Sequence, residues 1–254
     1  MTEDVFALEG HVAVVTGGLG QLGRAIVQGL EERGAKVAVF DVASDEFAVD
    51  VTDRAAIEAA ASRVREQWGE PTILVNAAAL DSPPDAPPEE VGPLETYPEE
   101  SFDRVLDVNV KGTFLCCQVI GTCMAAARRG SIVNISSIYG MLSPVQDLYE
   151  FRRRGGEEFV KPVAYSVSKS ALYNLTRYLA TYWAKDGVRV NTLTLAGVFD
   201  DQPREFLDEY SKRMPMGRMA DVAEVVGPVV FLASDASSYV TGSNLVVDGG
   251  WSAW

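Results

Sequence analysis

The sequence predicts an α/β fold in which a parallel sheet carries helices on both faces. Short segments rich in valine alternate with segments of helical periodicity along the whole chain. The valine-rich segments are almost continuously apolar, which is typical of strands buried on both faces of a parallel sheet. Composition does not change abruptly anywhere in the 254 residues. We therefore expect one doubly wound domain of the Rossmann type over residues 1–254.

The expected elements follow one another as strand, helix, strand. Buried strands are expected at six places: residues 11–17, 36–41, 72–76, 130–136, 188–195 and 243–249. Helices are expected at five places: residues 23–34, 53–69, 99–130, 164–187 and 221–234. Asp53 is a suitable N-cap for the second helix, and Gly34, Gly130 and Gly187 are suitable helix ends.

Three longer loops interrupt this alternation, at residues 79–100, 144–162 and 196–219. The first contains six prolines, so its start should lack regular structure. The third is charged, contains two prolines and is expected to fold as a short helical flap. Each loop follows a strand, so all three should lie at the carboxyl edge of the sheet, where open α/β folds bind their ligands.

The charge balance narrows the class of partner. The chain has 36 acidic and 22 basic side chains and a net charge of −14. Such a charge opposes a broad contact with a nucleic-acid backbone and disfavours anionic membrane surfaces. We therefore expect a small-molecule ligand, no nucleic acid and no membrane. An anionic ligand would need a local basic pocket.

Cysteine usage and hydropathy suggest a reduced compartment. Cys116, Cys117 and Cys123 are odd in number and lie in one apolar segment, which indicates buried thiols rather than disulfides. The chain contains no run of 18 apolar residues, and its start is acidic, so neither a membrane span nor a signal peptide is expected. His11 is the only histidine, so we expect no metal site and no His-based triad. These features together favour the cytoplasm.

A glycine-rich turn joins the first expected strand to the first helix. It contains Gly17, Gly18, Gly20 and Gly23. Glycines let a backbone approach a pyrophosphate, and a helix N-terminus offers free N–H groups and a partial positive charge. Because the turn lies between a strand and a helix, it indicates a dinucleotide site.

The second expected strand ends in an acidic residue that selects the nucleotide. Asp41 lies 18 residues beyond Gly23. A carboxylate there accepts hydrogen bonds from both ribose hydroxyls of NAD and disfavours the 2′-phosphate of NADP. Val42 follows, with no Arg or Lys beside it to bind that phosphate. We therefore expect NAD. Asp50 and Val51 are suited to bracket its adenine, as a polar acceptor beside an apolar wall.

A tyrosine and a lysine supply the candidate chemistry. Tyr165 and Lys169 are four residues apart on an expected helix, so their side chains share a face. A nearby ammonium favours the phenolate and lets a tyrosine exchange protons near neutral pH. Upstream, a strand ends at Ser136 and Ser137, where a hydroxyl can hold a carbonyl or alcohol oxygen.

Motifs over nearly the whole chain resemble the short-chain dehydrogenase/reductase family. Besides Asp41 and the Asp50–Val51 pair, they are TGGLGQLG (16–23), VNAAA (75–79), NVKG (109–112), NISS (134–137), YSVSK (165–169), RVNTLTLAG (189–197) and the closing segment 237–254. The resemblance implies that Tyr165 is the acid/base and that Lys169 lowers its pKa and contacts the nicotinamide ribose. It further implies that Ser137 orients the reacting oxygen, and that Asn109 holds a helix kink and a water connecting Lys169 to solvent.

The resemblance also implies a set of cofactor contacts. They are Gly17, Gly20, Gln21, Leu22, Asp41, Asp50, Val51, Asn76, Ala77, Ala78, Tyr165, Lys169 and Val198. Three departures from the family pattern fall among or beside these residues. Gln21 replaces the middle glycine of the turn, with Gly20 adjacent to supply flexibility. Ala77 and Ala79 replace an asparagine and a glycine, and Leu195-Ala196 replaces the usual Pro-Gly. None of these departures removes a catalytic group.

The segment 144–162 is longer than this family usually has between its serine and tyrosine, so we interpret it as a substrate-side insertion. Its eight charges sum to zero and include Arg152, Arg153 and Arg154 in a row. Two interpretations remain open. The charges pair with one another on a solvated loop, or one arginine clamps an anionic group of the substrate.

The detailed pattern is similar to a narrower branch of sugar dehydrogenases, including the flagellin-modification and nonulosonic-acid type. This likeness implies a polyhydroxylated substrate, neutral or anionic. Candidate substrate contacts are Ser137, Tyr139, Gln146, Tyr149, Arg152, Arg153, Arg154 and Asp200 to Gln202. The alternatives are the same chemistry on a ketoacyl thioester or a simple secondary alcohol, and a non-catalytic NAD-binding regulatory protein. The family also implies a homo-oligomer, a dimer or tetramer, packed through the long helices 99–127 and 164–184.

Overall fold

Six parallel strands form the sheet that the sequence predicts. The computed structural model describes residues 4–81 and 90–254. The sheet order is β2-β1-β3-β4-β5-β6, and every neighbouring pair is parallel. The strands are β1 (Val12–Thr16), β2 (Lys36–Phe40), β3 (Ile73–Asn76), β4 (Gly130–Ser137), β5 (Val188–Leu195) and β6 (Asn244–Val247). β2 lies on one side of β1 and β3 on the other, so the direction of strand order reverses at β1. A ligand crevice is therefore expected at the carboxyl ends of β1 and β3.

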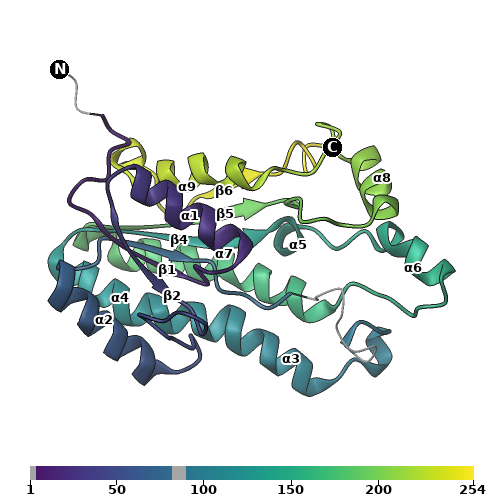
Figure 1. Ribbon diagram of the computed structural model, residues 1–254, viewed down its shortest axis with the longest axis horizontal. Coiled ribbons are helices and arrows are strands. Elements are labelled where there is room, and N and C mark those ends of the chain that lie inside the picture. Colours follow the sequence, from purple (N-terminus) through teal and green to yellow (C-terminus); the bar gives the residue numbers. More distant parts are fainter. Residues whose placement is uncertain (1–3, 82–89) are drawn as a thin grey trace.

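Helices cover both faces of this sheet (Figure 1). One face packs against α1 (Gln21–Glu32) and α9 (Val226–Ala233), and the other against α2 (Arg54–Trp68), α4 (Thr113–Ala127) and α7 (Val163–Trp183). Alternate residues of β1 enter the two cores, because successive side chains of a strand point to opposite faces. Val12 and Val14 join the α2/α4/α7 side, whereas Ala13 and Val15 join the α1/α9 side. The predicted doubly wound fold is confirmed.

Local signals explain where several helices begin and end. The Asp53 carboxylate caps α2 by accepting from the backbone N–H of Ala55 at 2.8 Å and of Ala56 at 3.3 Å. Gly34 has φ +96° and Gly187 has φ +74°, as expected of residues that end helices. The expectation for Gly130 is wrong, because α4 ends earlier, at Arg128 with φ 57°, and Gly130 begins β4.

The expected long helix at 99–130 is three segments in succession. They are α3 (Glu99–Leu106), a π-helical segment (Asp107–Gly112) and α4. By length and composition, Glu99–Ala127 is the one helical run among residues 4–81 and 90–254 that could cross a membrane. Its apolar side chains have another use here, since Cys116, Cys117, Ile120 and Met124 are fully buried in the core against α2 and the sheet.

Helices form in both of the loops 144–162 and 196–219. The insertion 144–162 holds a 3₁₀ turn (Gln146–Tyr149) and α6 (Glu150–Arg154), which its prediction as a loop did not include, whereas the flap 196–219 holds a short helix as predicted, α8 (Arg204–Arg213). A small apolar cluster joins them to the short helix α5 (Ile138–Met141) and to the C-terminal segment: Ile138, Tyr139, Leu148, Tyr210, Met214, Met219 and Trp251. The proline-rich start of 79–100 lies partly outside the described residues.

Candidate active site

The glycine-rich turn is built so closely that side chains do not fit at two of its positions. Gly17 has φ +65°, and a Cβ there would come within 2.7 Å of Ala78 Cα. A Cβ at Gly23 would lie 2.1 Å from the carbonyl oxygen of Gly17. The turn therefore brings β1, α1 and the segment after β3 together, with the N-terminus of α1 beside them. This cradle fits a pyrophosphate.

Gln21 occupies its unusual position without strain. It is the first residue of α1, and the preceding N-cap, Gly20, has an extended backbone with φ −71°. The left-handed conformation of the turn is at Gly17, with φ 65°, and the flexibility expected of Gly20 stays a prediction. The Gln21 side chain donates from Nε2 to the carbonyl oxygen of Phe199 at 2.6 Å, which joins the turn to the flap. Leu22 packs against the apolar core below the turn.

Asp41 lies beside the glycine turn at the end of β2. Its Oδ2 accepts from Leu19 N at 3.1 Å, and its Oδ1 accepts from Ala43 N at 3.1 Å. This places the carboxylate where a ribose would meet it. Asp50 is exposed and accepts from the backbone N–H and the hydroxyl of Thr52, both at 2.8 Å. Val51 is buried against the π-helical segment. Their adenine contacts remain predictions.

The segment after β3 keeps its course although its asparagine and glycine are replaced. The backbone N–H groups of Ala77 and Ala78 both donate to the Thr16 hydroxyl, at 3.2 and 3.1 Å. Asn76 is buried and donates from Nδ2 to Asn134 Oδ1 at 2.8 Å. Val198, beyond β5, pairs with Ala220 in an isolated bridge at the start of the flap.

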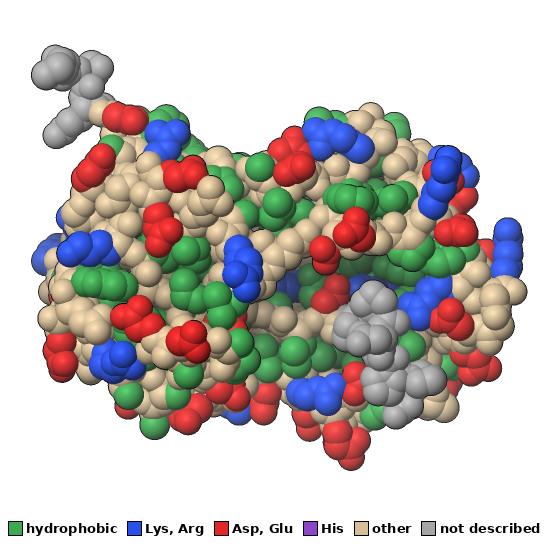
Figure 2. Space-filling view, viewed as in Figure 1, with side chains coloured by type: hydrophobic (Ala, Val, Ile, Leu, Met, Phe, Trp, Pro, Cys, Tyr) green, Lys and Arg blue, Asp and Glu red, His purple; other side chains and the backbone are tan. Residues whose placement is uncertain are grey.

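The predicted catalytic residues meet at the carboxyl edge of β4, on which α7 packs. Ser137 ends β4, and Tyr165 and Lys169 lie on one face of α7. The Lys169 ammonium lies 5.6 Å from the centroid of the Tyr165 ring and donates to the carbonyl oxygen of Ile135 at 3.0 Å. Ser136 fixes the helix by donating to the carbonyl oxygen of Lys169 at 3.0 Å. Figure 2 shows this side of the molecule hollowed, with basic and acidic atoms within the hollow.

Burial shifts the pKa of both the catalytic tyrosine and the catalytic lysine. Burial raises the pKa of Tyr165, the Asp81 carboxylate raises it further, and a hydrogen bond with the Ser137 side chain acts in the opposite direction. Burial lowers the pKa of Lys169 to about 8, against the influence of Asp81. Burial, Asp81 and Ser137 are thus the main influences on the phenol, and the lowering of the Tyr165 pKa by Lys169 that the family resemblance implies stays a prediction.

Asn109 lies in the π-helical segment, which interrupts the α-helical hydrogen bonding where the resemblance implies a kink. Its Oδ1 accepts from Leu80 N at 2.7 Å, and its Nδ2 donates to the Leu80 carbonyl oxygen at 2.9 Å. Nδ2 also donates to the hydroxyl of Ser168, the neighbour of Lys169, at 2.9 Å. Asn109 thus ties the segment after β3 to the catalytic helix. The water linking Lys169 to solvent remains a prediction.

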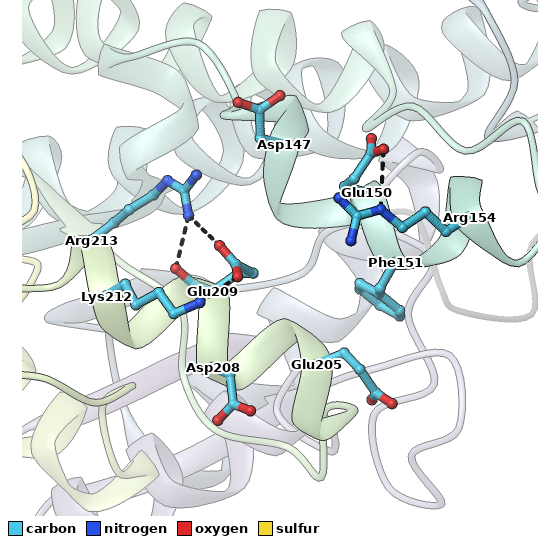
Figure 3. Close-up of a pocket in the computed structure, with 9 residues that line it drawn as sticks. All are labelled: Asp147, Glu150, Phe151, Arg154, Glu205, Asp208, Glu209, Lys212 and Arg213. Atoms are coloured by element: carbon cyan, nitrogen blue, oxygen red, sulfur yellow. Dashed lines mark hydrogen bonds and ion pairs between the residues drawn. The ribbon is translucent and has the colours of Figure 1, made fainter.

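The three arginines of the insertion pair within the insertion. Arg152 binds Glu157 at 2.6 Å and lies over the Phe159 ring, Arg153 binds Glu150 at 2.9 Å, and the exposed Arg154 lies 3.5 Å from Glu150. These contacts support the interpretation that the charges of the insertion pair with one another. They give no support to an arginine that clamps the substrate. A surface cavity of about 550 Å³ between α6 and α8, shown in Figure 3, is lined by Asp147, Glu150, Phe151, Arg154, Glu205, Asp208, Glu209, Lys212 and Arg213. It contains none of the catalytic residues.

The remaining substrate candidates have structural roles in part. Both polar atoms of the Gln202 side chain bond the backbone of the flap, and Gln146 bonds the backbone of Lys161. Tyr149 packs on Phe159 with ring centroids 4.7 Å apart. Tyr139 is buried, and burial raises its pKa. Their contacts with a substrate remain predictions.

Sequence reasoning missed two charged residues at this site. Lys161 Nζ lies 5.0 Å from the centroid of the Tyr165 ring and 2.5 Å from Asp81 Oδ1. Lys161 appeared in the sequence only as one of the balanced charges of the insertion. The signal that could have found Asp81 is its place after β3, at the carboxyl edge where ligands bind.

Comparisons with known proteins agree with this geometry. The family model described as enoyl-(acyl carrier protein) reductase matches residues 20–252. D-threitol dehydrogenase of Mycolicibacterium smegmatis is 33% identical, over 97% of this chain and 94% of that protein. Galactitol 2-dehydrogenase of Rhizobium johnstonii is 33% identical, over 98% of each chain.

Solved structures show the same likeness. A short-chain dehydrogenase of Leptospira borgpetersenii with bound NAD+ has a TM-score of 0.85 and 30% identity, covering 99% of this chain and 96% of that chain. A gluconate 5-dehydrogenase of Burkholderia cenocepacia, in complex with NADP and tartrate, has a TM-score of 0.82 and 26% identity, with coverages of 99% and 98%. The chain therefore belongs to the short-chain dehydrogenase/reductase family and is an oxidoreductase with a nicotinamide cofactor.

Proposed function

We propose that the protein is an NAD-dependent dehydrogenase that interconverts a secondary alcohol of a polyhydroxylated substrate and the corresponding ketone. The observation that carries the proposal is the meeting of Ser137, Tyr165 and Lys169 at the carboxyl edge of the sheet, beside a glycine turn that fits a dinucleotide. Together these groups can hold an oxygen, exchange its proton and lie next to the cofactor.

Each residue has a separate task in this reaction. The Ser137 hydroxyl accepts from Tyr139 N at 3.2 Å and hydrogen-bonds the Tyr165 side chain, so it would hold the reacting oxygen beside the tyrosine. In ketone reduction, the Tyr165 hydroxyl gives its proton to that oxygen, and in alcohol oxidation the phenolate takes the proton. A bound nicotinamide supplies the hydride acceptor or donor at the carbinol carbon. Lys169, with its pKa lowered to about 8, provides the cation that stabilises the phenolate when it forms.

The proposed choice of NAD rests on Asp41. Its carboxylate is fixed by Leu19 and Ala43 at the end of β2, where it would accept hydrogen bonds from ribose hydroxyls and repel a 2′-phosphate. Structures similar to this chain include complexes with NAD+ and with NADP, so the residue at this position, rather than the family, supports the choice.

The proposed substrate class rests on the polar lining of the site and on the relatives. D-threitol and galactitol dehydrogenases resemble the chain over almost its whole length. A ketoacyl thioester or simple alcohol is favoured less by a site that contains Asp81 and Lys161. A non-catalytic regulatory role is disfavoured by the intact Ser137, Tyr165 and Lys169.

We also propose a homo-oligomer in the cytoplasm. The exposed side chains Phe114 of α4 and Tyr178 and Tyr182 of α7 lie on the two helices expected to pack against a second subunit. The two tyrosines stack with centroids 5.9 Å apart and form an aromatic surface that such a contact would bury.

The test is NADH formation with a panel of polyols, followed for the wild-type protein and for Tyr165→Phe. We expect turnover with the wild type and a loss of about a hundredfold to ten-thousandfold in the variant, with NAD affinity measured by calorimetry nearly unchanged. Tight NAD binding without turnover of any alcohol would instead support the regulatory alternative.

A further inference from the structure

Asp81 and Lys161 come from two loops that meet beside Tyr165. Asp81 follows β3, and Lys161 ends the insertion just before α7. Lys161 Nζ and Asp81 Oδ1 are 2.5 Å apart. The lysine side chain is only 8% exposed, whereas that of the aspartate is 53% exposed. The pair therefore has a buried, fixed cation and an anion that solvent or a ligand can reach.

The insertion is folded so as to fix Lys161. Lys161 N donates to Gln146 Oε1 at 3.0 Å, and Gln146 Nε2 donates back to the Lys161 carbonyl oxygen at 3.4 Å. Arg153 holds these two segments together, because it donates to the carbonyl oxygens of Gln146 at 3.0 Å and of Phe159 at 3.3 Å. Arg153 is therefore a positioning residue, and the charge that the insertion delivers to the site is the ammonium of Lys161.

The charges of the pair face the reaction centre. The Asp81 carboxylate raises the pKa of Tyr139, Tyr149 and Tyr165 and of Lys169, so its field reaches every one of these groups. An ammonium has three donors and a carboxylate can accept several hydrogen bonds, so the 2.5 Å contact leaves capacity on both partners. A carboxylate facing the centre repels an anionic substrate group and readily accepts from a hydroxyl.

We propose that Asp81 and Lys161 form the specificity site for a neutral, vicinal polyol. Asp81, held in place by the buried Lys161, accepts a hydrogen bond from the substrate hydroxyl next to the reacting carbinol, which directs that carbinol toward Tyr165. This inference rests on the proposed function and names its substrate class. In this site a neutral hydroxyl takes the place of the anionic substrate group that an arginine would have bound.

The experiment compares wild type and Asp81→Asn on three substrates: galactitol as the neutral polyol, gluconate as its anionic counterpart and cyclohexanol with a single hydroxyl. For Asp81→Asn we expect kcat/KM with galactitol to fall on the order of tenfold to a hundredfold, since a charge-assisted hydrogen bond is lost. With cyclohexanol, which has no second hydroxyl, kcat/KM should change less than about twofold. Asp147→Asn, which alters a carboxylate of the surface cavity, is the matched control and should leave all three values unchanged.

The outcomes separate this inference from the proposed function. An equal loss on galactitol and cyclohexanol would mean that Asp81 acts through the fold or through its charge on Tyr165 and Lys169, and would overturn the specificity role. A wild-type preference for gluconate over galactitol would overturn the assignment of a neutral substrate. Wild-type protein that binds NAD and oxidises no alcohol would refute the proposed function itself. Asp81→Glu, which keeps the carboxylate, should restore part of the galactitol activity and guards against a variant that misfolds.

Discussion

Replacing Asp41 by Asn tests how the protein would distinguish its two possible cofactors. The carboxylate is fixed by two backbone donors, Leu19 N and Ala43 N, both at 3.1 Å. An asparagine keeps one acceptor oxygen and therefore one of these two backbone hydrogen bonds. The substitution also removes the negative charge and weakens the hydrogen bonds to a ribose. Comparing NAD with NADP on the same variant isolates the effect on the nucleotide, because the change in the turn is common to both cofactors.

The size of the expected change in cofactor preference follows from two separable effects. A 2′-phosphate carries nearly two negative charges at neutral pH, and two unit charges about 4 Å apart in water interact by about 1 kcal/mol. Because Asp41 is only partly buried, the high dielectric of water applies, and the repulsion of NADP is about 2 kcal/mol. Hydrogen bonds from ribose hydroxyls to a carboxylate contribute about 1.5 to 3 kcal/mol to NAD binding. Asp41→Asn should remove most of the first effect and part of the second.

We therefore expect the ratio of kcat/KM for NAD to that for NADP to fall about a hundredfold in Asp41→Asn. The assay is reduction of each cofactor with the same polyol, together with the affinity of each cofactor measured by calorimetry. Asp45→Asn changes an exposed carboxylate in the same loop and should leave the ratio unaltered. An unchanged ratio in Asp41→Asn, with both cofactors still bound, would show that another residue contacts the ribose and that this reasoning is wrong.

Two further predictions concern the turn and the catalytic lysine. Gly17→Ala should lose cofactor affinity and about 2 kcal/mol or more of unfolding free energy, since its φ of +65° is strained for alanine and its Cβ meets Ala78. Gly10→Ala, with φ +79° and no neighbour within 4 Å, should lose about 1 to 2 kcal/mol of unfolding free energy and no cofactor affinity. Equal effects of the two substitutions, in denaturant unfolding and in calorimetry, would contradict the steric argument. Burial depresses the pKa of Lys169 to about 8. Above that pH the unfolded chain binds one proton more than the folded chain, so the free energy of unfolding should rise toward pH 10. Lys169→Met should flatten that rise, and an identical pH dependence of stability in both proteins would disprove the prediction.

The pH dependence of turnover should also depend on direction. Burial raises the pKa of Tyr165, so the tyrosine is protonated at neutral pH. Ketone reduction needs that proton, whereas alcohol oxidation needs the phenolate. We expect kcat/KM for oxidation to increase as the pH rises above neutrality and that for reduction to decrease. Opposite trends, measured with one alcohol and its ketone, would remove Tyr165 from the role of acid/base.

The sheet could be predicted from sequence because each strand is a local signal. Every expected strand is present, since runs such as Val12–Thr16 are apolar on both faces and too short for helices. The interruption at Asp107–Gly112 is different, because a π-helical turn changes the hydrogen-bond partners and leaves the apolar pattern of a helix nearly intact. Family resemblance rather than periodicity indicated the kink at Asn109.

Two residues of the candidate site could not be predicted because they depend on a contact between distant loops. Asp81 and Lys161 are 80 positions apart, and nothing in either loop indicates that the other approaches it. The three consecutive arginines drew attention by their local density, yet Arg153 acts on the backbone of its own insertion. A run of charged residues indicates a solvated loop. Only the folded structure shows which of those charged side chains lies at the reaction centre.

A protein with a net charge of −14 must still bind an anionic dinucleotide. The lysines at the reaction centre do not solve this, since Lys161 is paired with Asp81 and Lys169 lies at the tyrosine. The backbone at the start of α1 supplies the attraction for the dinucleotide instead. The first turn of this 12-residue helix contains no acidic side chain, so its free N–H groups and the positive end of its dipole are not offset where the pyrophosphate would lie. Attraction of this kind is local and orients the cofactor, whereas a cluster of basic side chains would attract anions of every kind. An acidic surface with a backbone anion site would therefore suit the neutral polyol that we propose as the other ligand.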